Sequence, residues 1–197
     1  MPKILVNIIQ GFSARVRPEW TTVSHMVKHA LEPHMAHIEL NVENPGDRHC
    51  IRRSLSFLNR DPSHVVLIGK SLGGVRTWWM LRQYAAEIAR HRSVHCIFID
   101  PHGWQVGDGV IGSYGKNRGL PYYRDFDGFE LVNFYQHNRW PCGAVFKGQD
   151  FNRELGPGAD HFNITDMGSS ESEVVRREIS WVVERILQLK NAGSKDE

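Results

Sequence analysis

The stretch from His64 to Gly74 carries the residues best suited to chemistry. It contains an apolar run, then Gly69-Lys70-Ser71-Leu72-Gly73, then a helical pattern of apolar residues. The G-x-S-x-G spacing is typical of a strand that turns sharply into a helix and presents its serine at the top of a parallel sheet. Glycines on both sides of the serine avoid side-chain clashes in so tight a turn. We therefore predict that Ser71 is a nucleophile.

A serine hydroxyl is a weak nucleophile at its ordinary pKa, so it needs a base and a third group that orients the base. In the strand-turn-helix arrangement both partners lie at the carboxyl edge of the sheet, in the chain order serine, acid, histidine. The histidines after Ser71 are His91, His95, His102, His137 and His161. His91 and His95 flank the start of a strand, at the opposite edge. His161 follows the last predicted strand and precedes the last helix, so this order favours His161 as the base.

Two aspartates could orient that base. Asp100 ends one predicted strand and Asp150 follows the next, so both belong to the carboxyl edge of the sheet. Asp160 adjoins His161 and would have to curl back to reach the ring of its neighbour. The residues themselves leave Asp100 and Asp150 as alternatives.

Apolar strand patterns alternate with helical patterns along most of the chain. The predicted strands are 3–9, 36–42, 65–68, 94–99 and 142–147, and the predicted helices are 19–31, 51–58, 75–89 and one that begins near Ser169 or Ser170. Such alternation implies right-handed crossovers and a parallel sheet covered on both faces. We expect residues 1–197 to form one α/β domain, a three-layer sandwich with a mainly parallel sheet of roughly five strands.

The segment 102–139 breaks the alternation. It is rich in glycine and aromatic residues, and loops of this length in a compact domain are usually functional or contain short elements of their own. Two interpretations stay open: a lid-like cap above the sheet that favours apolar or aromatic substrate groups, and an ordinary excursion whose aromatic side chains belong to the core.

The sequence resembles the α/β-hydrolase superfamily in a reduced, five-strand form. The resemblance rests on 69–74, on Gln10-Gly11-Phe12 and on His161 before the last helix. The fragments 99–101, 133–136 and 159–164 are similar to small lipase-like hydrolases in which the aspartate of Asp-Pro is the triad acid.

This resemblance implies a catalytic triad of Ser71, His161 and Asp100. Asp150 is the alternative acid, because most of the superfamily takes its acid from the loop after the next strand. The same template implies an oxyanion hole formed by the backbone amides of Leu72 and Phe12. Gln10-Gly11 replaces the more common His-Gly, which leaves a main-chain donor in place.

The expected activity is that of a serine esterase that cleaves a carboxylic ester through an acyl-enzyme and uses no cofactor. A thioesterase, an amidase, or an inactive hydrolase-fold binding protein are the alternatives. A phosphate-binding loop is excluded, because that motif requires glycine where His64 stands and a flexible loop where the chain has an apolar strand.

Composition excludes several other classes of function. The formal net charge is only +2, and the basic residues are interleaved with acidic ones, so neither nucleic acid nor an anionic membrane is an expected partner. The 11 histidines are scattered and lack the additional ligands of a metal site. The N-terminal apolar run is too short to span a bilayer and lacks a signal-peptide cleavage pattern, which predicts a cytoplasmic protein. Nothing in the sequence indicates an oligomeric state.

Lys70 stands beside the predicted nucleophile, and two roles are open to it. Its charge could favour an anionic substrate, or it could be solvated at the surface. We expect the solvated role.

Overall fold

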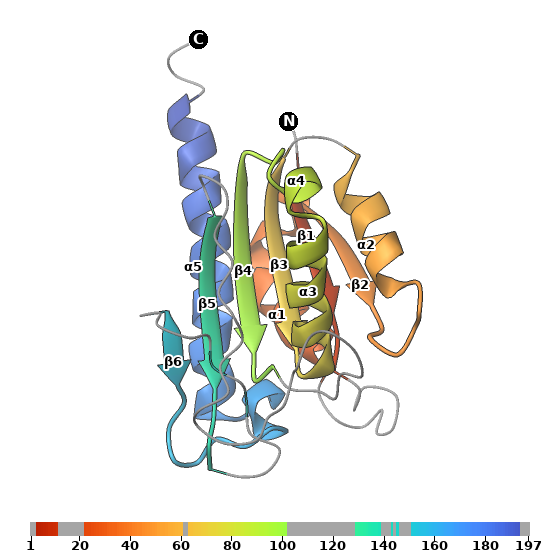
Figure 1. Cartoon of the computed structure of the whole chain (residues 1–197). Helices are drawn as coiled ribbons and strands as arrows, with labels where there is room; N and C mark the ends of the chain where they lie inside the picture. The colour runs from red at the N-terminus through yellow and green to blue at the C-terminus, as the bar shows by residue number, and fades with distance from the viewer. Residues whose placement is uncertain are drawn as a thin grey trace.

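The computed structural model describes residues 3–11, 22–60, 63–101, 129–138, 143, 145 and 151–193. In this part of the chain, strands and helices alternate around one sheet (Figure 1). The sheet has 6 strands in the order β2-β1-β3-β4-β5-β6, and every neighbouring pair is parallel. The strands are β1 (Ile4–Ile9), β2 (Ile38–Glu43), β3 (His64–Lys70), β4 (Ser93–Ile99), β5 (Phe129–Tyr135) and β6 (Asn152–Glu154).

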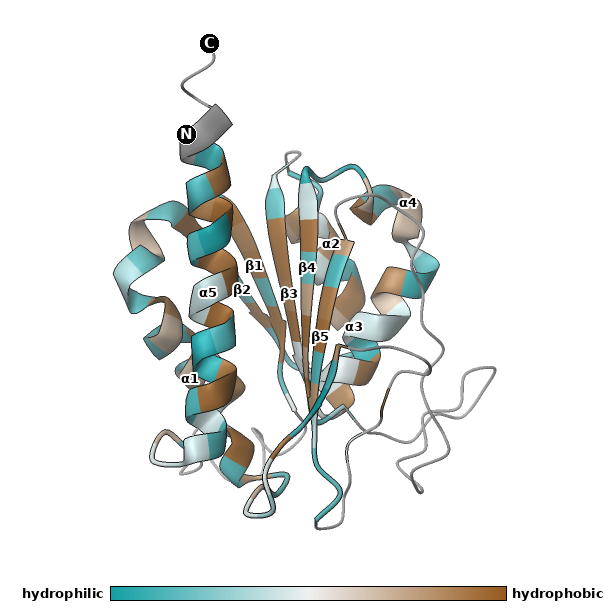
Figure 2. Cartoon of the chain, turned by 90° about the vertical axis from the view of Figure 1, so that its left-hand side faces the viewer, coloured by the Kyte–Doolittle hydropathy of each residue, from teal (hydrophilic) through white to brown (hydrophobic). Residues whose placement is uncertain are grey.

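Helices cover both faces of the sheet (Figures 1 and 2). Helices α1 and α5 pack on one face, and α2 and α3 pack on the other. The helices are α1 (Val23–Leu31), η2 (Glu32–His37), α2 (Cys50–Leu58), α3 (Leu72–Gln83), α4 (Ala85–Ile88), η3 (Asn163–Thr165) and α5 (Ser170–Gly193). The predicted three-layer α/β architecture with a mainly parallel sheet is confirmed.

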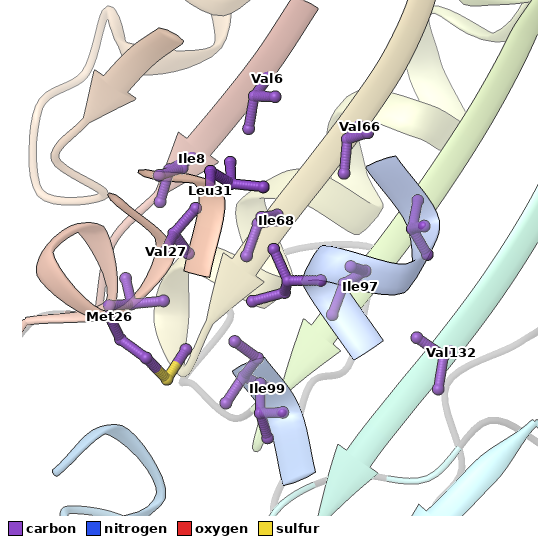
Figure 3. Packing of buried hydrophobic residues seen from close by; sticks show 14 of the residues in the cluster. Val6, Ile8, Met26, Val27, Leu31, Val66, Ile68, Ile97, Ile99 and Val132 are labelled. Atoms are coloured by element: carbon purple, nitrogen blue, oxygen red, sulfur yellow. The ribbon is translucent and has the colours of Figure 1, made fainter. Parts of the chain in front are cut away.

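The central strands are buried on both faces, which explains their unbroken apolar runs. All residues of β1 are buried; Ile4, Val6 and Ile8 belong to one core cluster and Leu5 to the other. Val6 and Ile8 pack with Met26 and Val27 of α1, as Figure 3 shows. Leu5, which precedes Val6 in the sequence, packs in the other cluster. The sheet therefore separates two apolar layers.

The predicted strand 142–147 and the predicted cap 102–139 need correction. The strand that pairs with β4 is β5, at Phe129–Tyr135, so these residues belong to the sheet and the sheet has 6 strands where roughly five were expected. Residues 143 and 145 lie outside any strand, and the rest of 142–147 lies outside the described residues. Residues 102–128 and 139 also lie outside the described residues. The two interpretations of this segment, a lid-like cap and an excursion packed in the core, therefore stay predictions there.

Polar residues within β5 account for the missed strand. Glu130 accepts two hydrogen bonds from Arg185 of α5, and the Asn133 side chain donates to Asn152 of β6 at 2.8 Å. The polar residues interrupt the pattern FELVNFY, so it lacks the run of apolar residues that marks β3 and β4. Their partners are distant in sequence, so the local pattern does not indicate that they fit in a sheet.

Helix α5, with 24 residues, is the longest element described. Val175, Ile179 and Val183 are buried in the core, whereas Arg177 is exposed on the opposite side. Its apolar stripe is therefore one face of an amphipathic helix. None of the described helices has both the length and the apolar character that a bilayer crossing requires.

Candidate active site

Ser71 forms a sharp turn between β3 and α3. Strand β3 ends at Lys70 and helix α3 begins at Leu72, so a single residue separates them. Ser71 adopts φ 54° and ψ −128°, a sparsely populated conformation that costs a serine about 1–3 kcal/mol. The Ser71 amide donates to the Ile99 carbonyl of β4 at 3.0 Å, and the Gly74 amide donates to the Ser71 carbonyl at 3.0 Å. These backbone hydrogen bonds hold the strained turn in place.

Glycines allow helix α3 to begin directly against the sheet. A Cβ on Gly73 would lie 1.9 Å from the carbonyl oxygen of Ile9, at the end of β1. A Cβ on Gly69 would lie 2.6 Å from the Cα of Gly74. Both contacts are with backbone atoms, which cannot move aside without disturbing a strand or a helix. The glycines of G-x-S-x-G are therefore a steric requirement of this turn.

The turn lies where the strand order of the sheet reverses. Strand β2 lies on one side of β1 and strand β3 on the other, and ligands of open parallel sheets bind at the carboxyl ends of strands at such a point. Gly11, just after β1, faces the turn, and a Cβ there would lie 3.2 Å from the Cβ of Ser71. Gly11 therefore keeps free the space beside the serine that a side chain would fill.

Asp100 directly follows β4 and is fully buried. It too has a positive φ, 46°, and its amide donates to the Phe134 carbonyl of β5 at 2.6 Å. Gln136 donates to the carboxylate twice: its amide N–H to Oδ1 at 3.3 Å and its side-chain Nε2 to Oδ2 at 3.4 Å. A Cβ on Gly143 would lie 2.1 Å from Oδ1, so a glycine is needed there as well. The carboxylate is thus fixed from several sides.

The structure brings His161 and Asp100 into direct contact. His161 Nδ1 lies 2.5 Å from Asp100 Oδ2, and the histidine side chain is only 5% exposed. An ionised carboxylate has no proton to donate, so Nδ1 carries the hydrogen and Nε2 is the ring nitrogen that carries the lone pair. This is the tautomer in which Nε2 can accept a proton.

A tight turn around Asp160 presents His161. Asp160 Oδ1 accepts hydrogen bonds from the amides of Phe162 and Asn163, each at 2.8 Å, and the Asp160 amide donates to Asn163 Oδ1 at 2.8 Å. The Phe162 ring packs edge-on against His161 with the ring centroids 5.4 Å apart, yet Phe162 is 46% exposed. Phe162 therefore offers an apolar surface beside the histidine. Asp160 shapes the loop, which agrees with the argument that it cannot orient the ring of its neighbour.

Burial and charge keep the imidazole neutral. Burial holds the pKa of His161 well below its ordinary value of 6.5, the Lys70 cation lowers this pKa further, and Asp160 opposes both effects. Burial also lowers the pKa of Lys70 from 10.5 to about 8, against the opposing attraction of Asp100 and Asp160. A neutral imidazole is the form that acts as a general base.

The expected solvated role of Lys70 is wrong. Its side chain is buried, with a residue exposure of 4%, and its Nζ donates to Thr165 Oγ1 at 2.9 Å. Sequence reasoning missed the burial because Thr165, the partner that makes it tolerable, lies 95 residues away along the chain.

Of the predicted oxyanion residues and the alternative acid, the structure describes only Leu72. Leu72 is the first residue of α3, where backbone amides point out of the helix end without helical partners. Phe12 and Asp150 lie outside the described residues.

Of the histidines not chosen as the base, His137 Nδ1 lies 3.5 Å from Glu154 Oε1, and His95 lies within β4 near its amino end. Among the residues that the structure describes, no group of three or more His, Cys, Asp or Glu side chains could hold a metal ion.

Sequence reasoning assigned no role to Gln136. The fragment 133–136 is similar to lipase-like hydrolases, but the function of its last residue depends on the contact with Asp100. Gln136 directly follows β5, and the carboxyl end of a parallel strand is the signal that could have marked it.

Comparisons with known proteins add little to this geometry. No family model matches the chain, and no curated protein matches it. A solved structure described as "the putative cell surface hydrolase from Lactobacillus plantarum WCFS1" is similar over 98% of this chain and 97% of that chain, with 10% sequence identity and a TM-score of 0.49. A likeness this low carries no argument about activity, so the functional inference rests on the residues of the site.

Proposed function

We propose that this protein is a serine hydrolase that cleaves carboxylic esters through an acyl-enzyme. The observation that carries the proposal is the buried contact between His161 and Asp100, on loops at the same edge of the sheet as the strained turn of Ser71. Asp100 would orient the imidazole and stabilise its protonated form, as in other serine hydrolases.

The proposed reaction has two halves. In the first, Ser71 Oγ attacks the ester carbonyl carbon while His161 Nε2 takes the hydroxyl proton, and the bond to the alcohol breaks as Nε2 returns that proton to the leaving oxygen. In the second, a water molecule attacks the acyl-enzyme, again with His161 as base, which releases the acid and restores the serine. The amides of Leu72 and Phe12 would stabilise the negative oxygen of each tetrahedral intermediate.

An ester with an apolar acyl or alcohol group is the substrate class that this site favours. Phe162 presents a half-exposed ring next to His161, and we propose that the apolar part of the substrate packs on this ring. An apolar substrate group that covers this ring would gain about 25 cal/mol per Å² of buried surface. Thioesters and amides could react through the same residues, and comparison of the three substrate types at matched acyl length would rank them.

Labelling with a fluorophosphonate tests the nucleophile. This probe forms a covalent bond with an activated serine, so we expect stoichiometric labelling of the wild type and none of Ser71→Ala. Intact-protein mass spectrometry measures the adduct. Ser180→Ala, on α5 and away from the turn, is the matched control and should label like the wild type. A folded wild-type protein that does not label would contradict the proposal and favour an inactive binding protein.

The pH dependence of hydrolysis tests the state of the base. Activity is lost on the acid side as His161 takes up a proton, and a lowered pKa moves this loss to lower pH. We therefore expect kcat/KM for phenyl butyrate to stay on its plateau as the pH falls through 6.5 and to decline only below that value. Phenol release measured across a pH series gives the profile. An acid limb centred at or above 6.5 would show that the imidazole is more solvated than the structure indicates.

A further inference from the structure

Lys70 is a buried cation that precedes the proposed nucleophile in the chain and interacts with the proposed base. It is the last residue of β3 and precedes Ser71, while its partner Thr165 lies in η3, four residues after His161. The hydrogen bonds continue in one direction: Lys70 Nζ donates to Thr165 Oγ1 at 2.9 Å, and Thr165 Oγ1 donates to the Phe162 carbonyl at 3.3 Å. A chain of two hydrogen bonds therefore joins the strand of the serine to the residue after the histidine.

The charge of Lys70 needs an explanation of its own. An ammonium loses its hydration when buried, and well-packed apolar residues often stabilise such a position better than charged ones. Among the residues that the structure describes, the charged and titratable groups that interact with it are Asp100 at the end of β4 and Asp160 and His161 on the histidine turn. A cation among them acts on the base directly, because it opposes protonation of the imidazole.

We propose that Lys70 is a positioning residue: its ammonium fastens the His161 turn to the strand that carries Ser71 and keeps the imidazole neutral. The catalytic meaning of this role rests on the proposed hydrolase function, but the physical contact does not. The effect of the charge and the effect of the hydrogen bond are each tested by a separate variant. Lys70→Met removes the charge and keeps the length of the side chain, and Thr165→Val keeps the charge and removes the hydroxyl that accepts the hydrogen bond.

Titration of the His161 ring followed by nitrogen-15 NMR tests the effect of the charge without requiring activity. Because the Lys70 cation lowers the pKa of His161, we expect Lys70→Met to raise the His161 titration midpoint by about one unit. His161→Gln assigns the signal. Lys28→Met, which removes an exposed lysine of α1, is the matched control and should leave the midpoint unchanged. Equal midpoints in Lys70→Met and the wild type would overturn the electrostatic part of the proposal.

The rate of fluorophosphonate labelling tests whether the hydrogen bond between Lys70 and Thr165 positions the His161 turn. We expect Thr165→Val to react about tenfold more slowly than the wild type at the plateau pH, with its His161 midpoint within a few tenths of a unit of the wild-type value. Thr165→Ser, which keeps the hydroxyl, should restore most of the rate. An unchanged rate in Thr165→Val would overturn the fastening role. A wild type that fails to label would instead disprove the hydrolase function, while the NMR titration would still decide what Lys70 does.

Unfolding separates this role from a merely structural one. The pKa of Lys70 is lowered to about 8 in the folded protein, so the charged form is disfavoured by folding at neutral pH. Lys70→Met should therefore unfold at a higher urea concentration than the wild type at pH 7. This advantage should shrink as the pH rises from about 8 to 10.5, where the wild-type lysine loses its proton in both states. A variant that is less stable than the wild type at pH 7, or that fails to fold, would show that Lys70 serves the fold and not the site.

Discussion

Replacement of Asp100 by asparagine is expected to lower kcat for ester hydrolysis by about 10⁴-fold while the protein stays folded. Asp100 Oδ2 accepts a hydrogen bond from His161 Nδ1 at 2.5 Å, and this contact sets the tautomer with the lone pair on Nε2. An asparagine can turn its NH2 group toward Nδ1, which favours the opposite tautomer with hydrogen on Nε2. The base would then carry a proton where it needs a lone pair.

The backbone makes this substitution a clean test. Asp100 has φ 46°, and asparagine tolerates the left-handed region as well as aspartate does, so the main chain need not move. Steady-state hydrolysis of phenyl butyrate gives kcat, and near-ultraviolet circular dichroism checks the fold. Asp150→Asn is the matched variant, because Asp150 is the alternative acid. A large loss in Asp150→Asn together with near-normal turnover in Asp100→Asn would assign the role to Asp150.

Replacement of Gly73 by alanine should lower the free energy of unfolding by about 3 kcal/mol or more. The added Cβ would lie 1.9 Å from the Ile9 carbonyl oxygen and 2.4 Å from that of Gln10. Both are backbone atoms at the end of β1, so the clash is relieved only if α3 moves away from the sheet. Urea unfolding followed by circular dichroism measures the change.

Gly156→Ala is the control for this substitution. Among the described residues, the atom nearest to its Cβ would be Glu171 Oε1 at 3.9 Å, so the free energy of unfolding should change by less than about 0.5 kcal/mol. Equal stabilities of the two variants would mean that the start of α3 is not packed on β1 as described.

The sequence predicts the centre of this fold better than its outer part. Strands β1, β3 and β4 are buried on both faces, so their apolar runs are local signals that do not depend on knowing the neighbours. Strand β5 is different, because its polar residues Glu130 and Asn133 bind partners on other elements, among them Arg185 and Asn152. Such tertiary partners are invisible in a single strand pattern.

The same distinction holds within the site. The turn at Ser71 could be predicted because its glycines and its strand are contiguous, and chain order along the edge of a parallel sheet favoured His161. Chain order left Asp100 and Asp150 as alternatives, and only the family resemblance favoured Asp100. Lys70 was misjudged, since a lysine next to a turn is usually solvated and its burial depends on Thr165. Burial and hydrogen bonding across long sequence separations are properties of the packed molecule.

The positive φ of Asp100 narrows the choice of amino acid at this position beyond the need for an acid. Glutamate carries the same charge and could reach a histidine, but the left-handed region favours asparagine, aspartate and glycine over longer side chains. Glycine and asparagine fit the backbone without supplying a carboxylate. Aspartate alone among the common residues meets both demands, so the shape of the main chain, and not only the chemistry of the site, selects the residue that touches the histidine.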